Sequence, residues 1–188
     1  MMKKITVLIA TILVLSILLC ACGGNAETTT AAKEETTAAG QDTTQGEQTD
    51  AKFEAPVLLA SVGASADISI AKSILDKAGI EYTVYENGAD VAGYKSAILV
   101  PGVSVKGLGS AGISVEDELA ATKALVSALK AANTPIVVAH LGGSSRRDEL
   151  TDQFIDVVLP DAAFILALAE GNADNKFSDF ASANGIEY

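Results

Sequence analysis

The residues best suited to chemistry gather in one stretch, 140–148, which reads His-Leu-Gly-Gly-Ser-Ser-Arg-Arg-Asp and holds the only His and both Arg residues of the chain. Its two glycines permit close approach of a ligand to the backbone. A helix starting at Ser145 would offer free N–H groups and a positive dipole end to an anion. The guanidinium groups of Arg146 and Arg147 would add paired donors for a carboxylate or a phosphate. The stretch is therefore a candidate anion-binding site.

A simpler interpretation of the two arginines stays open. Both side chains would then be solvated in the first turn of a helix and would pair with Asp148, Glu149 or Asp152. If the anion site forms instead, Lys106 from a neighbouring stretch would converge on the same ligand.

Three further stretches are rich in small and polar residues: 61–67, 101–112 and 170–174. Four glycines fall between positions 102 and 112, which favours a long irregular loop of the kind that forms lids and binding loops; the alternative is that the glycines only accommodate irregular backbone. The predicted ligand-binding residues of the whole set are Ser61, Gly63, Ser65, Ser104, Lys106, Gly107, His140, Gly142, Gly143, Ser145, Arg146 and Arg147.

None of these stretches carries a nucleotide motif. There is no Gly-x-x-x-x-Gly-Lys-Ser/Thr, and no Gly-x-Gly-x-x-Gly after an expected strand, so neither a phosphate-binding loop nor a dinucleotide fingerprint is present. The stretch 61–65 lacks the Thr/Ser-rich loop and flanking aromatics with which flavodoxins hold FMN. We expect no cofactor.

His140 is a weak candidate for a catalytic base, because several serines would lie near it in the predicted fold. A Ser–His hydrolase needs a strained nucleophile turn such as Gly-x-Ser-x-Gly, and the sequence contains none. A hydrogen-bonded structural role for this histidine is the simpler interpretation.

Glu170, Asn172 and Asp174 space three oxygen ligands two residues apart, as calcium loops do. The central glycine and the closing bidentate Glu of such loops are missing. These residues are weak metal candidates, and a solvated turn is the alternative; no metal site is expected.

Apolar runs alternate with amphipathic segments through the C-terminal part of the chain. Short buried runs predict strands, and Asp67 is expected to cap the first helix, which Gly79 ends. Strands are expected at 56–63, 80–86, 94–103, 135–141 and 163–169, and helices at 68–78, 115–133, 146–159 (opened by Ser145) and 176–184.

This alternation predicts an α/β fold, a three-layer sandwich with a five-stranded, mainly parallel sheet in the flavodoxin-like order 2-1-3-4-5. In such sheets ligands bind outside the carboxyl ends of the strands. The four stretches above all follow expected strands, so the fold would bring them to one edge of the sheet.

The first 22 residues are typical of a bacterial export signal: a basic start, an apolar run, and then Leu-Cys-Ala-Cys at 19–22. A small residue before Cys22 resembles the lipoprotein box, so Cys22 is predicted to be lipidated. The alternative is a short membrane anchor. Both cysteines lie in this segment, and a disulfide in the rest of the chain is therefore excluded.

Residues 23–54 are predicted to be a disordered tether. Positions 25–50 contain eight Thr but no Val, Ile, Leu, aromatic or Pro residue, so they have nothing to bury that would offset chain entropy. One domain is expected at 55–188, with nine basic and seventeen acidic residues. This charge argues against a nucleic-acid partner.

The stretches 59–67, 106–113 and 139–143, together with Arg146 and Arg147, resemble those of an uncharacterised family of bacterial lipoproteins, a domain-of-unknown-function group. The similarity covers residue 56 to the end. It implies lipoprotein export and one α/β domain, and it brings no activity or catalytic residue.

Three functions remain open from the sequence. We favour a lipid-anchored module on the extracytoplasmic face of the cell membrane that binds a small anionic metabolite and acts with a membrane-protein partner. The alternatives are a protein–protein interaction domain of the cell envelope and a hydrolase using His140. Binding is favoured over catalysis because no catalytic constellation is evident.

Overall fold

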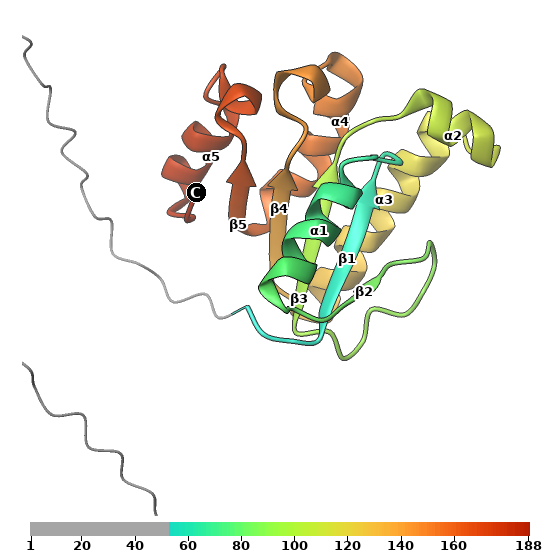
Figure 1. Ribbon diagram of the computed structural model, residues 1–188, viewed down its shortest axis with the longest axis vertical. Coiled ribbons are helices and arrows are strands. Elements are labelled where there is room, and N and C mark those ends of the chain that lie inside the picture. The colour runs from blue at the N-terminus through green and yellow to red at the C-terminus, as the bar shows by residue number, and fades with distance from the viewer. Residues whose placement is uncertain (1–52) are drawn as a thin grey trace, which may run out of the picture. The chain divides into compact units, whose positions relative to one another are not determined.

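A computed structural model describes residues 53–188 of the chain (Figure 1). The predicted signal segment, Cys22 and nearly all of the predicted tether lie outside the described residues. Five strands and five helices follow one another, joined in three places by 3₁₀ turns. They are β1 (Val57–Val62), α1 (Ile68–Ala78), β2 (Tyr82–Val84), β3 (Ser96–Pro101), α2 (Val105–Ala111), α3 (Val115–Ala131), β4 (Ile136–His140), η1 (Gly143–Arg146), α4 (Glu149–Val158), η2 (Leu159–Asp161), β5 (Ala162–Ala167), η3 (Ala169–Asn172) and α5 (Lys176–Asn184).

The strands form one parallel sheet in the order β2-β1-β3-β4-β5. This confirms the predicted fold class and strand order. The central strands are buried on both faces, which explains their nearly continuous apolar sequences. β2 is shorter than expected, and at the opposite edge the backbone N–H of Ile165 donates to the carbonyl oxygen of Glu187.

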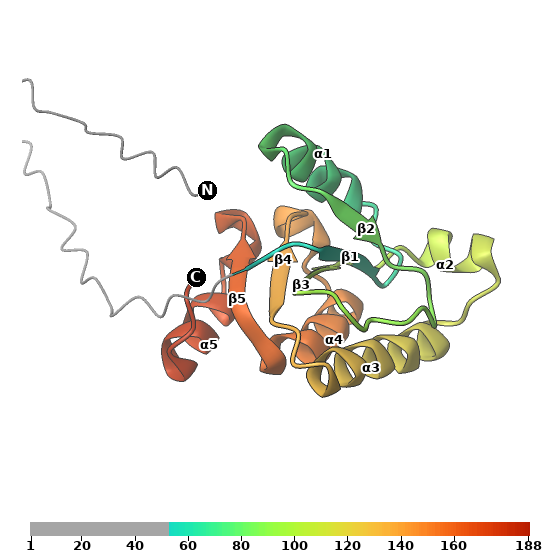
Figure 2. The ribbon, with the colours of Figure 1, turned by 90° about the horizontal axis from the view of Figure 1, so that it is seen from below.

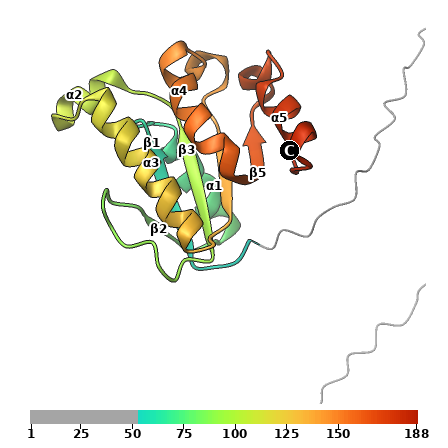
Figure 3. The same ribbon diagram turned by 180° about the vertical axis from the view of Figure 1, so that it is seen from behind.

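Helices lie on both faces of the sheet, but unevenly. The larger apolar core joins the sheet to α3, α4 and α5 and contains Leu99, Phe154 and Phe177, all fully buried. The smaller core lies under α1, around Leu59 and Leu75. Figure 2 shows α1 on one side and α3 and α4 on the other, and Figure 3 shows α3 and α4 across the rear of the strands. Both cores draw their buried members from residues 58–181, so the segment 53–188 contains everything needed to fold by itself.

The stretch predicted as a long irregular loop, 102–112, is wrong in part, because most of it forms α2. The Ser104 hydroxyl accepts a hydrogen bond from the Gly107 N–H (3.1 Å) and caps the helix, while Leu108 buries its side chain in the larger core. The cap and this one apolar contact outweigh the low helix propensity of two internal glycines. Gly112 ends the helix in the left-handed conformation.

The predicted start of the fourth long helix is also wrong. Ser145 does not cap it; its hydroxyl donates to the Gly142 carbonyl oxygen (2.9 Å) within η1. The cap is Asp148, whose carboxylate accepts from the Thr151 N–H at 2.7 Å. This bond favours the ionised carboxylate and lowers the pKa of Asp148. A charged acceptor at a helix start gains from the helix dipole as well, so the helix begins three residues later than expected.

Within residues 53–188, no helix has both the length and the apolar character needed to cross a bilayer.

Candidate functional site

The predicted edge of the sheet carries an open cleft of about 530 Å³. It lies where the start of α1 meets the connections that follow β4 and β5. Most of its wall is the η1 turn, and two carboxylates and one guanidinium face it. The lining residues are Asp67, Ile70, Leu141, Gly142, Gly143, Ser144, Ser145, Arg146, Leu168 and Glu170.

Asp67 is the unusual member of this cleft. Asp67 occupies the N-cap position of α1, as the sequence predicts, but its side chain makes no cap hydrogen bond. Only 8% of the residue is exposed, and its Oδ2 atom is buried without a hydrogen-bond partner. A buried carboxylate oxygen without a partner is costly, and native proteins rarely keep one without a use for it.

Gly142 makes room for this carboxylate. A Cβ atom at Gly142 would overlap both Asp67 Oδ2 and the Arg146 side chain. Across the cleft floor, a Cβ atom at Gly102 would come within 2.7 Å of Ser65 Oγ. Two glycines at the ends of neighbouring strands therefore let the carboxylate lie directly against the backbone.

Arg146 is the one cation in the cleft wall, and it is loosely held. Its Nε atom lies 3.6 Å from Asp67 Oδ2, and its Nη1 atom is 3.5 Å from the Val103 carbonyl oxygen. Both distances are at the long limit for hydrogen bonding. Since a third of the side chain is exposed, the guanidinium has donors free for an incoming anion.

Arg147, its neighbour, is fully engaged. Its guanidinium donates to both oxygens of Asp152 (2.8 and 3.3 Å), to both oxygens of Asp174 (3.0 and 2.6 Å) and to the Gly171 carbonyl oxygen. It also lies 5.3 Å from the ring centre of Phe177, and only 11% of the side chain is exposed. The pairing with Asp152, which the sequence left as an alternative, is confirmed. Arg147 ties the start of α4 to the segment before α5.

This cluster changes the titration of its members. Hydrogen bonds from Arg147 lower the pKa of Asp174 to about 2, and the two carboxylates raise the pKa of Arg147. The positive charge of Arg147 is thus balanced by two carboxylates of the protein itself.

His140 is completely buried at the end of β4 and stacks on Phe177 with 5.4 Å between ring centres. Its Nε2 atom is 3.3 Å from the Gly143 carbonyl oxygen. A carbonyl can only accept, so Nε2 carries the proton and Nδ1 is the unpartnered acceptor. Burial lowers the pKa of His140, and the Arg147 charge adds to this effect; the Gly143 and Pro101 carbonyls and the Asp67 charge oppose it. These contacts describe a neutral structural histidine.

We therefore expect the single imidazole of the chain to stay neutral well below its usual pKa. Burial disfavours the charged form, so His140 contributes most to stability above about pH 6.5, and this contribution falls as pH drops toward its lower folded-state pKa. An NMR titration of the histidine ring signals, which need no assignment because the chain has one His, checks this. A midpoint near 6.5 in the folded protein would contradict the account.

The remaining predicted ligand-binding residues lie elsewhere. Ser65 is buried, and its hydroxyl accepts from the Asp67 N–H (3.3 Å); Ser104 and Gly107 form the cap of α2. The hydroxyl of Ser61 donates to the Ser65 carbonyl (3.1 Å), and Ser61 faces a second hollow of about 210 Å³.

That second hollow is mostly apolar and lies between β1, β2, α2 and α3. The Gly63 N–H donates to Glu118 Oε1 (3.1 Å) at its wall. Lys106 is exposed on α2 and does not line the strand-end cleft. The structure thus brings Gly142, Gly143, Ser145 and Arg146 together in the cleft wall. His140 and Ser65 lie behind this wall, in contact with Gly143 and Asp67, and the other predicted residues do not line the cleft.

The predicted calcium-like stretch does not converge on one point. The Asn172 side chain donates to Ser178 Oγ (2.9 Å) and accepts from the Phe177 N–H (2.9 Å), Asp174 pairs with Arg147, and Glu170 faces the cleft. Across residues 53–188, no group of three or more His, Cys, Asp or Glu side chains could hold a metal ion.

Sequence reasoning missed Asp67 as a site residue. Its position before a helix explains it fully as a cap, and nothing local distinguishes a capping aspartate from one turned into a cleft. The apolar rim, Ile70 and Leu168, was missed because single exposed apolar residues are common.

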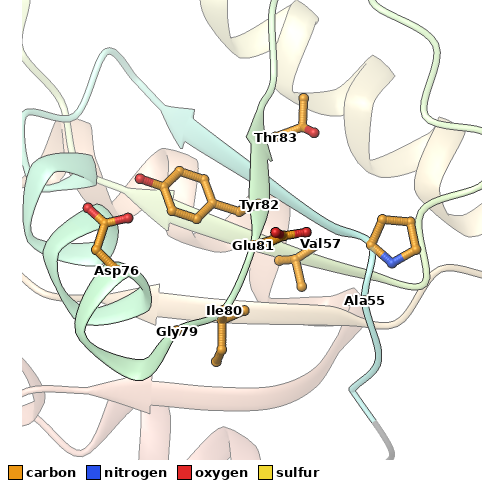
Figure 4. Close-up of a pocket in the computed structure, with 9 residues that line it drawn as sticks. Ala55, Val57, Asp76, Gly79, Ile80, Glu81, Tyr82 and Thr83 are labelled. Carbon is orange, nitrogen blue, oxygen red and sulfur yellow. The ribbon is translucent and has the colours of Figure 1, made fainter.

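A larger hollow, about 960 Å³, lies at the other end of the strands, beside β2 (Figure 4). Its charged wall residues, Asp76 and Glu81, are exposed. Partial burial and the nearby Asp76 carboxylate raise the pKa of Tyr82, and Figure 4 shows the Tyr82 hydroxyl directed toward that carboxylate. The wall contains no cation and no buried unpartnered polar atom, so size alone does not make it the candidate site.

The fold and the cleft together define a doubly wound α/β domain with flavodoxin-like strand order and a polar site at the carboxyl ends of its strands. Residues 54–188 match the model of the DUF6305 family, described as a domain of unknown function, and the chain belongs to this family. The match confirms the resemblance to an uncharacterised family. No curated protein and no solved structure matches the chain.

Proposed function

We propose that the protein is a lipid-anchored extracytoplasmic binding module that holds a small anionic metabolite in the strand-end cleft and presents it to a membrane partner. The observation that carries the binding role is the buried, unpartnered Oδ2 atom of Asp67 beside the loosely held guanidinium of Arg146. A ligand that supplies a donor to Asp67 and an anionic group to Arg146 would satisfy both.

The charges of the cleft narrow the ligand class. Asp67 and Glu170 are acidic and Arg146 is the one basic residue of the wall. A multiply charged phosphate would meet two carboxylates at short range, which is unfavourable. A small carboxylate that also carries a hydroxyl or an ammonium group fits better, because its donor neutralises or hydrogen-bonds an acid while Arg146 takes its carboxylate.

The proposed location at a membrane is inferred from the first part of the sequence. Predicted lipidation at Cys22 and the polar composition of residues 25–50 support a domain held clear of a membrane by a flexible segment. The hydrolase alternative gains no support from the contacts of His140, since neither ring nitrogen bonds a serine hydroxyl or a carboxylate.

A thermal-shift screen of residues 53–188 tests the proposal. The compounds are small hydroxy- and amino-carboxylates, simple carboxylates, inorganic phosphate and nucleosides. A ligand at a hundred times its dissociation constant adds about 2.7 kcal/mol, which raises the melting temperature of a domain this size by about 5–10 °C. We expect a shift from a carboxylate that carries a donor. If no class produces a shift, the binding role is contradicted.

Two glycine substitutions show where the ligand binds. Gly142→Ala places a methyl group where Asp67 and Arg146 meet, so we expect the shift from an active ligand to disappear. Gly109→Ala is the matched control, since a Cβ atom at Gly109, on the exposed side of α2, meets nothing within 4 Å. The same thermal-shift assay compares the two. An unchanged shift in Gly142→Ala would place the ligand outside this cleft.

A further inference from the structure

One face of the sheet is only partly covered by helices. On the side of α1, that helix covers β1, β3 and, at Ala139, the end of β4, while α3, α4 and α5 all join the core of the opposite side. The strand register pairs Val137 with Phe164 and Ala139 with Leu166. The alternate residues, such as Ile165, belong to the opposite core, so the paired residues face the side of α1. In Figure 2, α1 lies on this side of the sheet, and short unlabelled turns lie at the ends of β4 and β5.

The uncovered area is apolar, and we call it the open face. It consists of Val137 and Phe164, which are half-buried, and of six side chains that are each 38–48% exposed: Phe53, Ile70, Ile74, Ile80, Leu166 and Leu168. Most of the large exposed apolar side chains of residues 53–188 are therefore in this one area.

Two hollows lie at the two ends of the open face. At the amino ends, Phe53 and Ile80 line a hollow of about 480 Å³ together with Ile98 and Val137. At the carboxyl ends, Ile70 and Leu168 form the rim of the strand-end cleft. Exposed apolar patches of this kind in soluble domains mark interaction sites.

We propose that the open face is the contact between two copies of this chain, related by a two-fold axis. A two-fold contact needs a surface complementary to itself, and an apolar face with its charged residues at the two ends (Glu54 and Glu81 in one hollow, Glu170 in the other) meets this condition. At roughly 80 Å² apiece, the six exposed side chains of each copy together bury on the order of 1,000 Å² in the pair. Adding the sheet residues between them reaches the range of specific interfaces.

Residues 25–50 do not supply an occupant for this face. The segment that precedes the domain arrives at this face, because the Phe53 ring packs edge-on against Phe164 with 5.9 Å between centres. Yet positions 25–50 contain no Val, Ile, Leu or aromatic residue to cover it. An anionic lipid surface is opposed by the domain's charge, with nine basic and seventeen acidic residues.

Sedimentation analysis of residues 53–188 without ligand tests the contact, independently of the strand-end cleft. We expect a reversible dimer at micromolar concentration. Because the acidic domains repel one another, added salt should tighten it. Leu166→Lys and Ile74→Lys each place a charge inside the open face, and each should raise the dimer dissociation constant at least about tenfold. Val105→Lys, at an equally apolar and more exposed position on α2, should leave it unchanged.

The second variant keeps the test decisive if Leu166→Lys fails to fold. Ile74 lies on the surface of α1, and lysine is a good helix former, so Ile74→Lys should fold. A parent protein that is monomeric over the same range would overturn the proposal, and so would a dimer that neither face variant weakens or that Val105→Lys weakens equally. Binding of a monomeric parent to phospholipid vesicles, lost in Leu166→Lys, would assign the face to lipid instead and would also overturn it.

Discussion

Replacing Arg147 by Met is expected to lower the free energy of unfolding by about 2–4 kcal/mol. The Met side chain keeps an apolar stem of similar length but loses the guanidinium that lies over the Phe177 ring. It loses the ion pairs with Asp152 and Asp174 and the bond to the Gly171 carbonyl. The range lies below that of fully buried ion pairs because the Asp174 side chain is half exposed, so water replaces part of the interaction.

Urea unfolding at several pH values measures this effect and its cause. Because Arg147 holds the folded-state pKa of Asp174 at about 2, the stabilisation from Asp174 is complete above about pH 4 and is lost as pH falls toward 2. The difference between parent and variant should therefore shrink over that window. Lys130→Met is the control: it breaks a surface pair with Asp161 (2.7 Å) and should cost less than about 1 kcal/mol. Equal losses in the two variants would contradict a special role for Arg147.

Asp67→Asn is expected to weaken ligand binding without lowering the free energy of unfolding. The amide keeps the shape of the side chain and removes a buried charge whose Oδ2 atom has no hydrogen-bond partner. The free energy of unfolding should stay the same or rise by up to about 1 kcal/mol. Affinity for the carboxylate identified by the screen should fall at least about tenfold, because the variant no longer presents a negative charge to the ligand's donor.

Urea unfolding measures the stability of the variant, and calorimetric titration of the same samples measures its affinity for the ligand. Asp76→Asn is the matched control, since it makes the same chemical change at an exposed carboxylate in the larger hollow. A loss of stability in Asp67→Asn with unchanged affinity would make Asp67 a structural residue and would contradict its assignment to the site. A loss of affinity in Asp76→Asn alone would move the site to the other end of the strands.

The strands and their order could be predicted because they depend on short-range patterns. Runs such as 57–62 are apolar at every position except Ser61. Where such runs alternate with amphipathic segments, they indicate buried strands. The capping aspartate at position 148 was harder to predict, because a serine three residues earlier gives the same local signal. Two competing caps differ by about 1 kcal/mol, which is less than tertiary contacts contribute.

The different roles of the two adjacent arginines could not be predicted from the sequence. Arg147 is engaged by Gly171 and Asp174, which lie 24 and 27 residues further along the chain, and only the folded connection between β5 and α5 brings them close. Arg146 remains available because its neighbour takes these partners. The open face has the same origin: the sequence predicts helices on both faces, but α5 follows Phe177 into the larger core, so no helix covers β5 on the side of α1.

A double-mutant cycle on ligand affinity tests the central claim, that Asp67 and Arg146 bind one small molecule together. Isothermal titration calorimetry would compare the parent, Asp67→Asn, Arg146→Gln and the double variant, using the carboxylate identified by the screen. We expect each single variant to weaken binding at least about tenfold, and the double variant to bind less weakly than the two losses combined imply, because both groups hold the same ligand. Undiminished affinity in both single variants would show that the ligand does not contact this pair and would contradict the account.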